Sequence, residues 1–96
     1  MSETIDGLTI AFSEDGIEVT KELDKHILSK GAWTTIIFRY QDFNKTKQEY
    51  GPVKYSIRRY QKRNNQYWQK SKFNISSNDQ AEKIINILSE WLKLSD

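Results

Sequence analysis

Most of the chain alternates apolar and polar positions with the period of two that is typical of a β-strand. The first alternating segment, residues 7–20, surrounds the turn dipeptide Asp15-Gly16 and predicts a β-hairpin. We expect its second arm to continue as a long bent strand to a turn at residues 29–31, where Gly31 permits a tight bend. The next segment, residues 32–40 (AWTTIIFRY), is dense in β-branched and aromatic residues and predicts another strand.

Two further strands are predicted in the middle of the chain. A polar loop over residues 41–51 precedes a strand over residues 53–60, and a turn at residues 62–65 (KRNN) leads to a strand over residues 67–75. Because the connections are short, we expect neighbouring strands to be antiparallel.

The C-terminal segment changes to a helical period. Ser77 and Gln80 have the spacing of a capping box. The apolar positions that follow have the three-and-four spacing of an amphipathic helix, and they are Ala81, Ile84, Ile85, Leu88, Trp91 and Leu92. Several strands followed by one helix predict an α+β fold, a curved antiparallel sheet of four to five strands covered on one side by a C-terminal amphipathic helix. We expect this sheet-plus-helix domain to occupy residues 17–96, after an acidic N-terminal hairpin arm or tail of residues 1–16.

Composition agrees with one small folded domain. The 96 residues are 36% hydrophobic and 29% charged, which is the balance of a globular protein. No apolar run approaches the ~20 residues of a membrane span, and the start MSETIDGLTI lacks the pattern of a signal peptide. We therefore expect a cytoplasmic protein without membrane contact, associated with the nucleoid if it is bacterial.

Charge is distributed unevenly along the chain. Residues 1–24 hold one Lys against seven acidic residues, whereas residues 25–72 hold twelve Lys and Arg against two acidic residues. Ten of the twelve aromatic residues also lie between Trp33 and Phe73. A solvated surface would account for the cations, but not for the rings that accompany them.

Alternation along the strands assigns these residues to two faces. One face is expected to form the core beneath the helix, and it comprises Ile36, Phe38, Val53, Tyr55, Ile57, Phe73 and Ile75. The opposite face collects Thr35, Ile37, Ser56 and Asn74 together with the cations and rings of a candidate binding site. That site comprises Trp33, Arg39, Lys54, Arg58, Tyr60, Trp68, Lys70 and Lys72.

A basic face with flat rings suits single-stranded nucleic acid, because cations neutralise phosphates while unpaired bases stack on aromatics at about 1–3 kcal/mol per base. Three alternatives remain open. The rings could close a second small core or a dimer interface while the cations protect a sheet edge from aggregation. The same face could also dock a peptide or a protein partner, and RNA could replace DNA as the ligand.

Three stretches resemble a known family: GAWTTIIFRY, KYSIRRY and SKFNISSNDQAEKI. With them, the region from Ile17 to Leu92 resembles the transcriptional coactivator family called positive cofactor four, including its small bacterial relatives. The resemblance implies a curved sheet followed by one helix, a homodimer formed through the C-terminal helix, and single-stranded DNA bound along basic and aromatic sheet surfaces. By position, it implies that Arg58 and Tyr60 face the nucleic acid, with Lys70 and Lys72 on the neighbouring strand. The preference for DNA over RNA rests on this resemblance, and the pathway is left open among transcription, replication and repair.

Catalysis finds little support in the sequence. The single histidine, His26, stands beside Asp24 and Glu22 without a second strong ligand or a nucleophile, and the chain has no cysteine. We therefore expect a binding protein that is not an enzyme, with no catalytic residues, no metal site and no cofactor.

Overall fold

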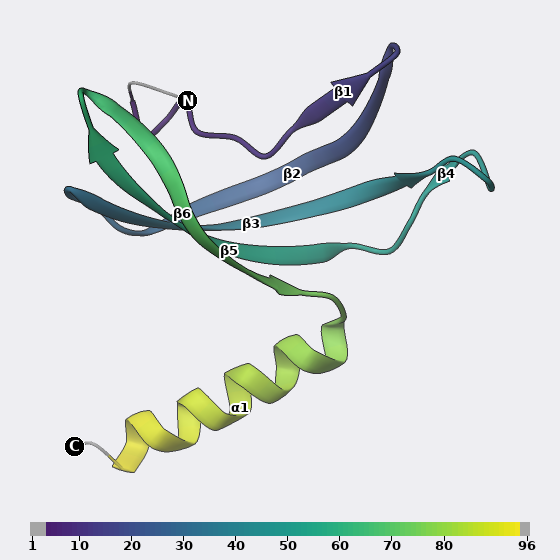
Figure 1. The fold of residues 1–96 in the computed structure, drawn as a ribbon. Coiled ribbons are helices and arrows are strands. Elements are labelled where there is room, and N and C mark those ends of the chain that lie inside the picture. The colour runs from purple at the N-terminus through teal and green to yellow at the C-terminus, as the bar shows by residue number, and fades with distance from the viewer. Residues whose placement is uncertain (1–3, 95–96) are drawn as a thin grey trace.

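The computed structural model describes residues 4–94 as a curled antiparallel sheet followed by one helix (Figure 1). The elements are β1 (Phe12–Glu14), β2 (Ile17–Ser29), β3 (Trp33–Asn44), β4 (Glu49–Tyr50), β5 (Lys54–Arg63), β6 (Gln66–Ile75) and α1 (Asn78–Leu94). The strand order is β1-β2-β3-β5-β6, every pairing is antiparallel, and the short β4 pairs with the end of β3. The predicted α+β fold is thus confirmed. The predicted segments 1–16 and 17–96 include residues 1–3 and 95–96, which lie outside the described residues.

Two tight turns form where the sequence predicts them. Asp15 and Gly16 connect β1 to β2, and Asn64 and Asn65 connect β5 to β6. All four residues have positive φ angles, between 53° and 80°. Two central residues with positive φ match the right-handed twist of the flanking strands, and Asn, Asp and Gly adopt this conformation at little cost.

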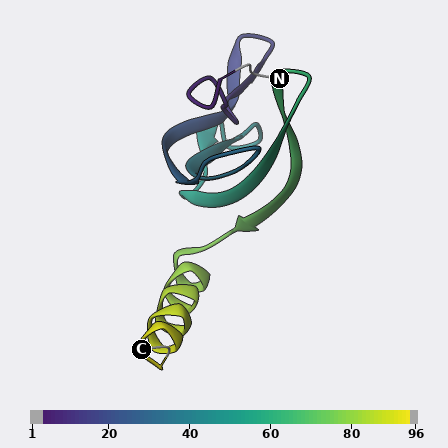
Figure 2. The same cartoon turned by 90° about the vertical axis from the view of Figure 1, so that its left-hand side faces the viewer.

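The sheet curls because its register shifts at several points. β2 departs from regular pairing with β3 between Glu22 and Asp24 and again between Ile27 and Ser29. β5 and β6 lose register beside Tyr60, where Lys70 is an extra residue in β6. Such bulges bend a strand and increase its twist. The resulting curl is visible when the sheet is viewed from the side (Figure 2).

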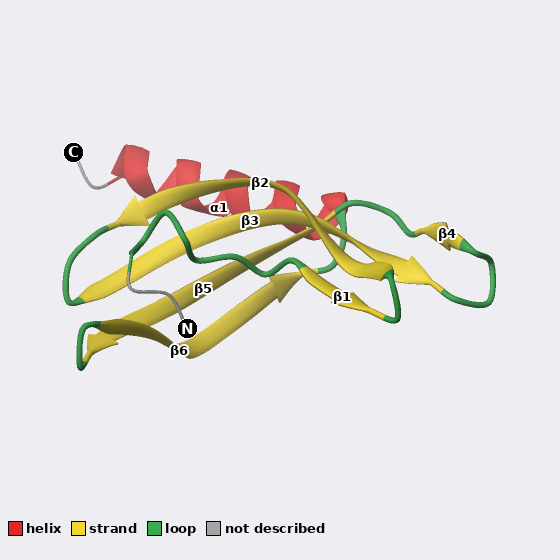
Figure 3. Ribbon diagram, turned by 90° about the horizontal axis from the view of Figure 1, so that it is seen from above, coloured by secondary structure: helices red, strands yellow, loops and turns green. Residues whose placement is uncertain are grey.

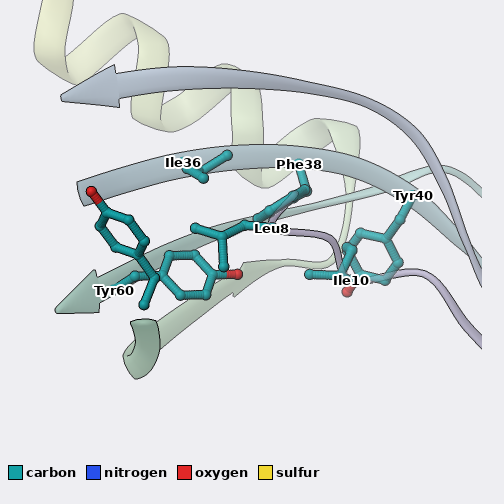
Figure 4. Close-up of a cluster of buried hydrophobic side chains, with 7 residues drawn as sticks. Leu8, Ile10, Ile36, Phe38, Tyr40 and Tyr60 are labelled. Carbon is teal, nitrogen blue, oxygen red and sulfur yellow. The ribbon is translucent and has the colours of Figure 1, made fainter. Parts of the chain in front are cut away.

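The hydrophobic core lies on one side of the sheet, under the N-terminal segment. Residues 4–11 cross this side, as the view from above shows (Figure 3). Leu8, which is 3% exposed, and the buried Ile10 join side chains from three strands. The other members of this cluster are Ile36, Phe38, Tyr40, Tyr60 and Tyr67 (Figure 4).

Polar contacts from β2 hold the N-terminal segment in place. The Lys25 ammonium donates to the backbone oxygens of Asp6 and Leu8 at 2.8 and 2.6 Å. The Glu22 carboxylate accepts hydrogen bonds from the Thr9 hydroxyl at 2.7 Å and the Ile10 amide at 3.2 Å. Part of the segment expected to be an arm or tail is therefore built into the core.

The helix begins at the predicted cap. The Ser77 hydroxyl accepts from the Gln80 amide, and the Gln80 side chain accepts from the Ser76 amide, each at 3.2 Å. Beyond this start, α1 lies on the side of the sheet opposite the N-terminal segment and projects away from it (Figures 1 and 2). Five of its large apolar residues are exposed, and these are Ile85, Ile87, Leu88, Trp91 and Leu92. The prediction that the helix covers the core is wrong, because residues 4–11 occupy that place.

The overall dimensions reflect the projecting helix. The radius of gyration is 15.5 Å, whereas a compact chain of this length has about 12.5 Å. No helix within residues 4–94 is long and apolar enough to cross a membrane.

Candidate nucleic-acid interface

The strand register defines two faces of the sheet. Residues paired directly across antiparallel strands point to the same side, and β3 pairs Phe38 with Ser56 and Ile37 with Ile57. We call the side covered by residues 4–11 the inner face, and the side on which α1 lies the outer face (Figure 1). Phe38 and Ser56 are fully buried on the inner face. The predicted orientation of β5, with Ile57 in the core, is therefore wrong by one residue.

Other residues expected in the core follow the same shift. Tyr55 lies on the outer face in the row next to Ile57, and Phe73 pairs with Ile57 and is exposed. Ile75 is buried as expected, although it is the cross-strand partner of Tyr55 and not of an inner-face residue. The inner face of β5 instead carries polar and aromatic side chains.

The eight candidate residues do not lie on one face. The inner face holds Lys54, Arg58, Tyr60 and Lys72, the outer face holds Trp33, Arg39 and Trp68, and Lys70 is the bulge residue of β6. The bulge explains part of the division. In a regular strand Trp68, Lys70 and Lys72 would share a side, but one inserted residue turns Trp68 and Lys72 to opposite sides.

Tyr60 is part of the core and does not present its ring to solvent. It is only 3% exposed and belongs to the same cluster as Leu8. Burial raises the pKa of its phenol above the ordinary value; Arg58 nearby acts in the opposite direction and Glu22 in the same direction. The expectation that Tyr60 faces nucleic acid does not fit this placement.

Arg58 is held in a fixed orientation on the inner face. Its Nε donates to the Ser56 hydroxyl at 3.2 Å and its Nη1 donates to the Gln69 side-chain oxygen at 3.1 Å. The Ser56 hydroxyl in turn donates to the Asn74 side-chain oxygen at 2.7 Å. All these acceptors are neutral, and no ion pair among residues 4–94 includes Arg58. Its positive charge is therefore oriented but not compensated.

Two lysines flank this arginine on the inner face. Lys72 is its cross-strand partner on β6 and is exposed, which puts two cations side by side with Cβ atoms about 5 Å apart. Lys54, two rows away, forms an ion pair with Asp42 at 3.2 Å. Of the inner-face cations in the candidate set, Arg58 and Lys72 thus have the greater capacity to bind an anion.

The outer face carries the exposed rings. Trp33 and Trp68 are both cross-strand partners of Gln61, and they are 42% and 41% exposed. The Arg59 guanidinium lies 4.5 Å from the centre of the Trp33 ring, where it forms a cation–π contact. Arg39 is also exposed here, opposite Asp24 of β2. These rings and cations are available because α1 does not cover the face.

Sequence reasoning missed Gln69 and Arg59. Gln69 orients Arg58 through a hydrogen bond. No residue type or spacing in the sequence predicts this contact, because it depends on the bulge that places Gln69 opposite Tyr60. Arg59 was assigned to neither face, although alternation from the buried Ser56 would have placed it beside Trp33 on the outer face. The alternation along β5 does indicate the face of Arg59, but the prediction took Ile57 as the core residue and so assigned the two faces of β5 the wrong way round.

Within residues 4–94, no group of three or more His, Cys, Asp or Glu side chains could hold a metal ion. His26 and Asp24 form an exposed pair at 3.5 Å on β2. The arrangement is therefore one of cations, amides and rings, suited to binding an anionic and planar ligand. No family model matches the chain, and neither a curated protein nor a solved structure is significantly similar to it.

Proposed function

We propose that the protein binds single-stranded DNA and acts by binding, without catalysis. The observation that carries this proposal is Arg58, whose guanidinium is oriented by two neutral acceptors beside the exposed Lys72. A carboxylate would neutralise the charge of an arginine paired with it. Within residues 4–94, Arg58 has no such partner among its hydrogen-bond acceptors, so its guanidinium can bind a phosphate. The exposed Trp33 and Trp68 add surfaces on which unpaired bases can stack.

A single strand can reach both faces by crossing the edge of the sheet. Among residues 4–94, β6 is the last strand of the sheet, and no further strand pairs with its outer edge. Within five residues of β6, Lys72 lies on the inner face, Lys70 at the bulge and Trp68 on the outer face. A flexible strand can follow this path, whereas a stiff duplex with a persistence length of about 150 base pairs cannot wrap so short an edge.

We further propose that the protein is a homodimer formed through α1. The exposed apolar residues of α1 lie along one side of the helix, and within residues 4–94 Trp91 is 63% exposed there. A helix with one apolar side requires a partner for that side. Pairing of two copies by a two-fold axis would bury the same surface on each.

Binding is tested by fluorescence anisotropy over a range of salt concentrations, with labelled oligo(dU), oligo(rU) and a duplex. We expect oligo(dU) to bind better than the duplex, with an affinity that falls steeply with salt. Lys72→Gln should reduce the salt slope by roughly 0.7, the value for one phosphate contact in a single strand. Lys47→Gln removes one exposed cation from the loop between β3 and β4 and serves as the matched control.

The outcomes separate the alternatives. Stronger binding of oligo(rU) would identify RNA as the ligand, since the two oligomers differ only at the 2′-hydroxyl. Equal loss in Lys72→Gln and Lys47→Gln would mean diffuse attraction and no defined site. Absence of binding to all three nucleic acids would overturn the proposal and favour a protein-interaction module on the same faces.

A further inference from the structure

A hollow lies at the end of the β5–β6 hairpin, next to the Arg58 network. Its volume is about 370 Å³, and it is lined by Arg63, Asn64, Trp68, Gln69 and Lys70. Two of these side chains are cationic, two are amides, one is an indole, and none is acidic. The size lies within the range of sites for small molecules. Such side chains suit a ligand with a planar ring and an anionic group.

The indole of Trp68 is fixed at this hollow with part of its surface exposed. Its Nε1 donates to the Arg63 backbone oxygen at 3.3 Å. The side chain remains 41% exposed. Trp33, by contrast, carries Arg59 over its ring, and no cation within residues 4–94 is placed in this way over Trp68. Trp68 is therefore the better oriented of the two for stacking on a base.

The two cations are brought to the hollow by the hairpin geometry. The two-residue turn at Asn64 and Asn65 returns the chain tightly, so Arg63 stands directly opposite β6. The bulge redirects Lys70 out of the regular alternation of β6. Neither Arg63 nor Lys70 takes part in an ion pair among residues 4–94, so both charges can meet an anion.

Gln69 joins this hollow to the inner face. Its side-chain oxygen accepts from Arg58, while the residue also lines the hollow. From this geometry we infer that the hollow is a nucleotide site, in which one unpaired base stacks on Trp68 and its phosphate binds between Arg63 and Lys70. This inference rests on the proposed function. It places the nucleotide site where a bound single strand of DNA, after its contact with Arg58, would cross the edge of the sheet. The amides of Asn64 and Gln69 can meet the edge of any base, so we expect little base preference.

The test follows the three indole N–H signals of the protein by NMR during titration with dAMP. We expect the Trp68 signal to move most, with smaller changes at Trp33 and Trp91. The double variant Arg63→Gln/Lys70→Gln should weaken dAMP binding roughly tenfold, because it removes two charge-assisted contacts. The matched control is Lys45→Gln/Lys47→Gln, which removes two charges from the loop between β3 and β4.

Equal weakening in the two double variants, or a largest shift away from Trp68, would overturn the nucleotide site. A parallel anisotropy titration with oligo(dU) separates this failure from that of the proposed function. If the oligomer binds the Arg63→Gln/Lys70→Gln variant as tightly as the wild type, the nucleotide site is refuted while single-strand binding stands. If the oligomer does not bind the wild type, single-strand binding is refuted, and the dAMP titration decides the site by itself.

Discussion

The substitution Leu8→Ala tests whether the N-terminal segment is part of the folded core. Leu8 is 3% exposed and belongs to the cluster that closes the inner face. Leu→Ala at a buried site costs about 2–5 kcal/mol, depending on how far the surroundings collapse. Residues 4–11 form the outermost layer over the inner face, so they can move toward the sheet and partly fill the cavity left by the substitution. We therefore expect the lower part of that range, about 2–3 kcal/mol.

Urea denaturation at one fixed protein concentration measures this loss. For an m-value of about 1.5 kcal/mol/M, the midpoint should fall by roughly 1.3–2 M. A chain of this size has a total stability of about 5–15 kcal/mol, so the variant should remain folded in buffer unless the wild type lies near the lower limit.

Leu28→Ala is the matched control. Leu28 is 57% exposed at a bulge in β2, and its replacement should change stability by less than about 0.5 kcal/mol. If both variants unfold at the midpoint of the wild type, residues 4–11 do not form part of the core and the assigned inner face is wrong.

Three further predictions follow from the placement of Tyr60 and Trp91. Tyr60→Ala should cost about 3–5 kcal/mol in urea denaturation, as expected for loss of a buried ring, and a stability near that of the wild type would contradict its burial. The raised pKa of Tyr60 means that the folded protein holds the phenol proton more tightly than the unfolded chain, so this contribution is complete below pH 10 and is lost as pH rises through the folded pKa. Tyr60→Phe should therefore lose less stability than the wild type between pH 9 and pH 11, and equal losses would refute the assignment. Light scattering should give twice the chain mass for the wild type and a shift toward the monomer for Trp91→Ala, with Glu90→Ala as control; a wild-type monomer at all concentrations would refute the dimer.

The strands and the helix could be predicted because their signals are local. The turn dipeptide at Asp15, the β-branched run that begins at Trp33 and the cap at Ser77 each specify an element within a few residues. The strand pairs follow from the short connections. These features need no knowledge of the rest of the chain.

The face of β5 could not be predicted from apolar character alone. Ser56 is fully buried because its hydroxyl is satisfied by Asn74, and the equally buried Thr34 donates to the Gly31 backbone oxygen at 3.1 Å. Small hydroxyl residues with satisfied hydrogen bonds can occupy a core at little cost. Ile57 was therefore a misleading marker of the core side.

The division of the candidate site also has a physical cause outside the alternation rule. No residue type in Gln69-Lys70-Ser71 marks the bulge in the sequence. The bulge nevertheless reverses the side of the sheet to which every later residue of β6 points. The packing of residues 4–11 over the core could not be predicted either. Leu8 packs against residues far along the chain, and an alternation with a period of two does not indicate which face of a sheet such a segment will cover.

The position of residues 4–11 also bears on the order of events during synthesis. Leu8 and Ile10 are translated before Tyr60 and Tyr67, which complete their cluster and follow them by fifty or more residues. Until then, Leu8 and Ile10 can meet only part of their cluster, the residues Ile36, Phe38 and Tyr40 of β3. Such long separations slow folding and prolong the exposure of apolar surface. We expect the seven acidic residues among the first 24 positions to keep this segment hydrated and to repel other copies of the nascent chain.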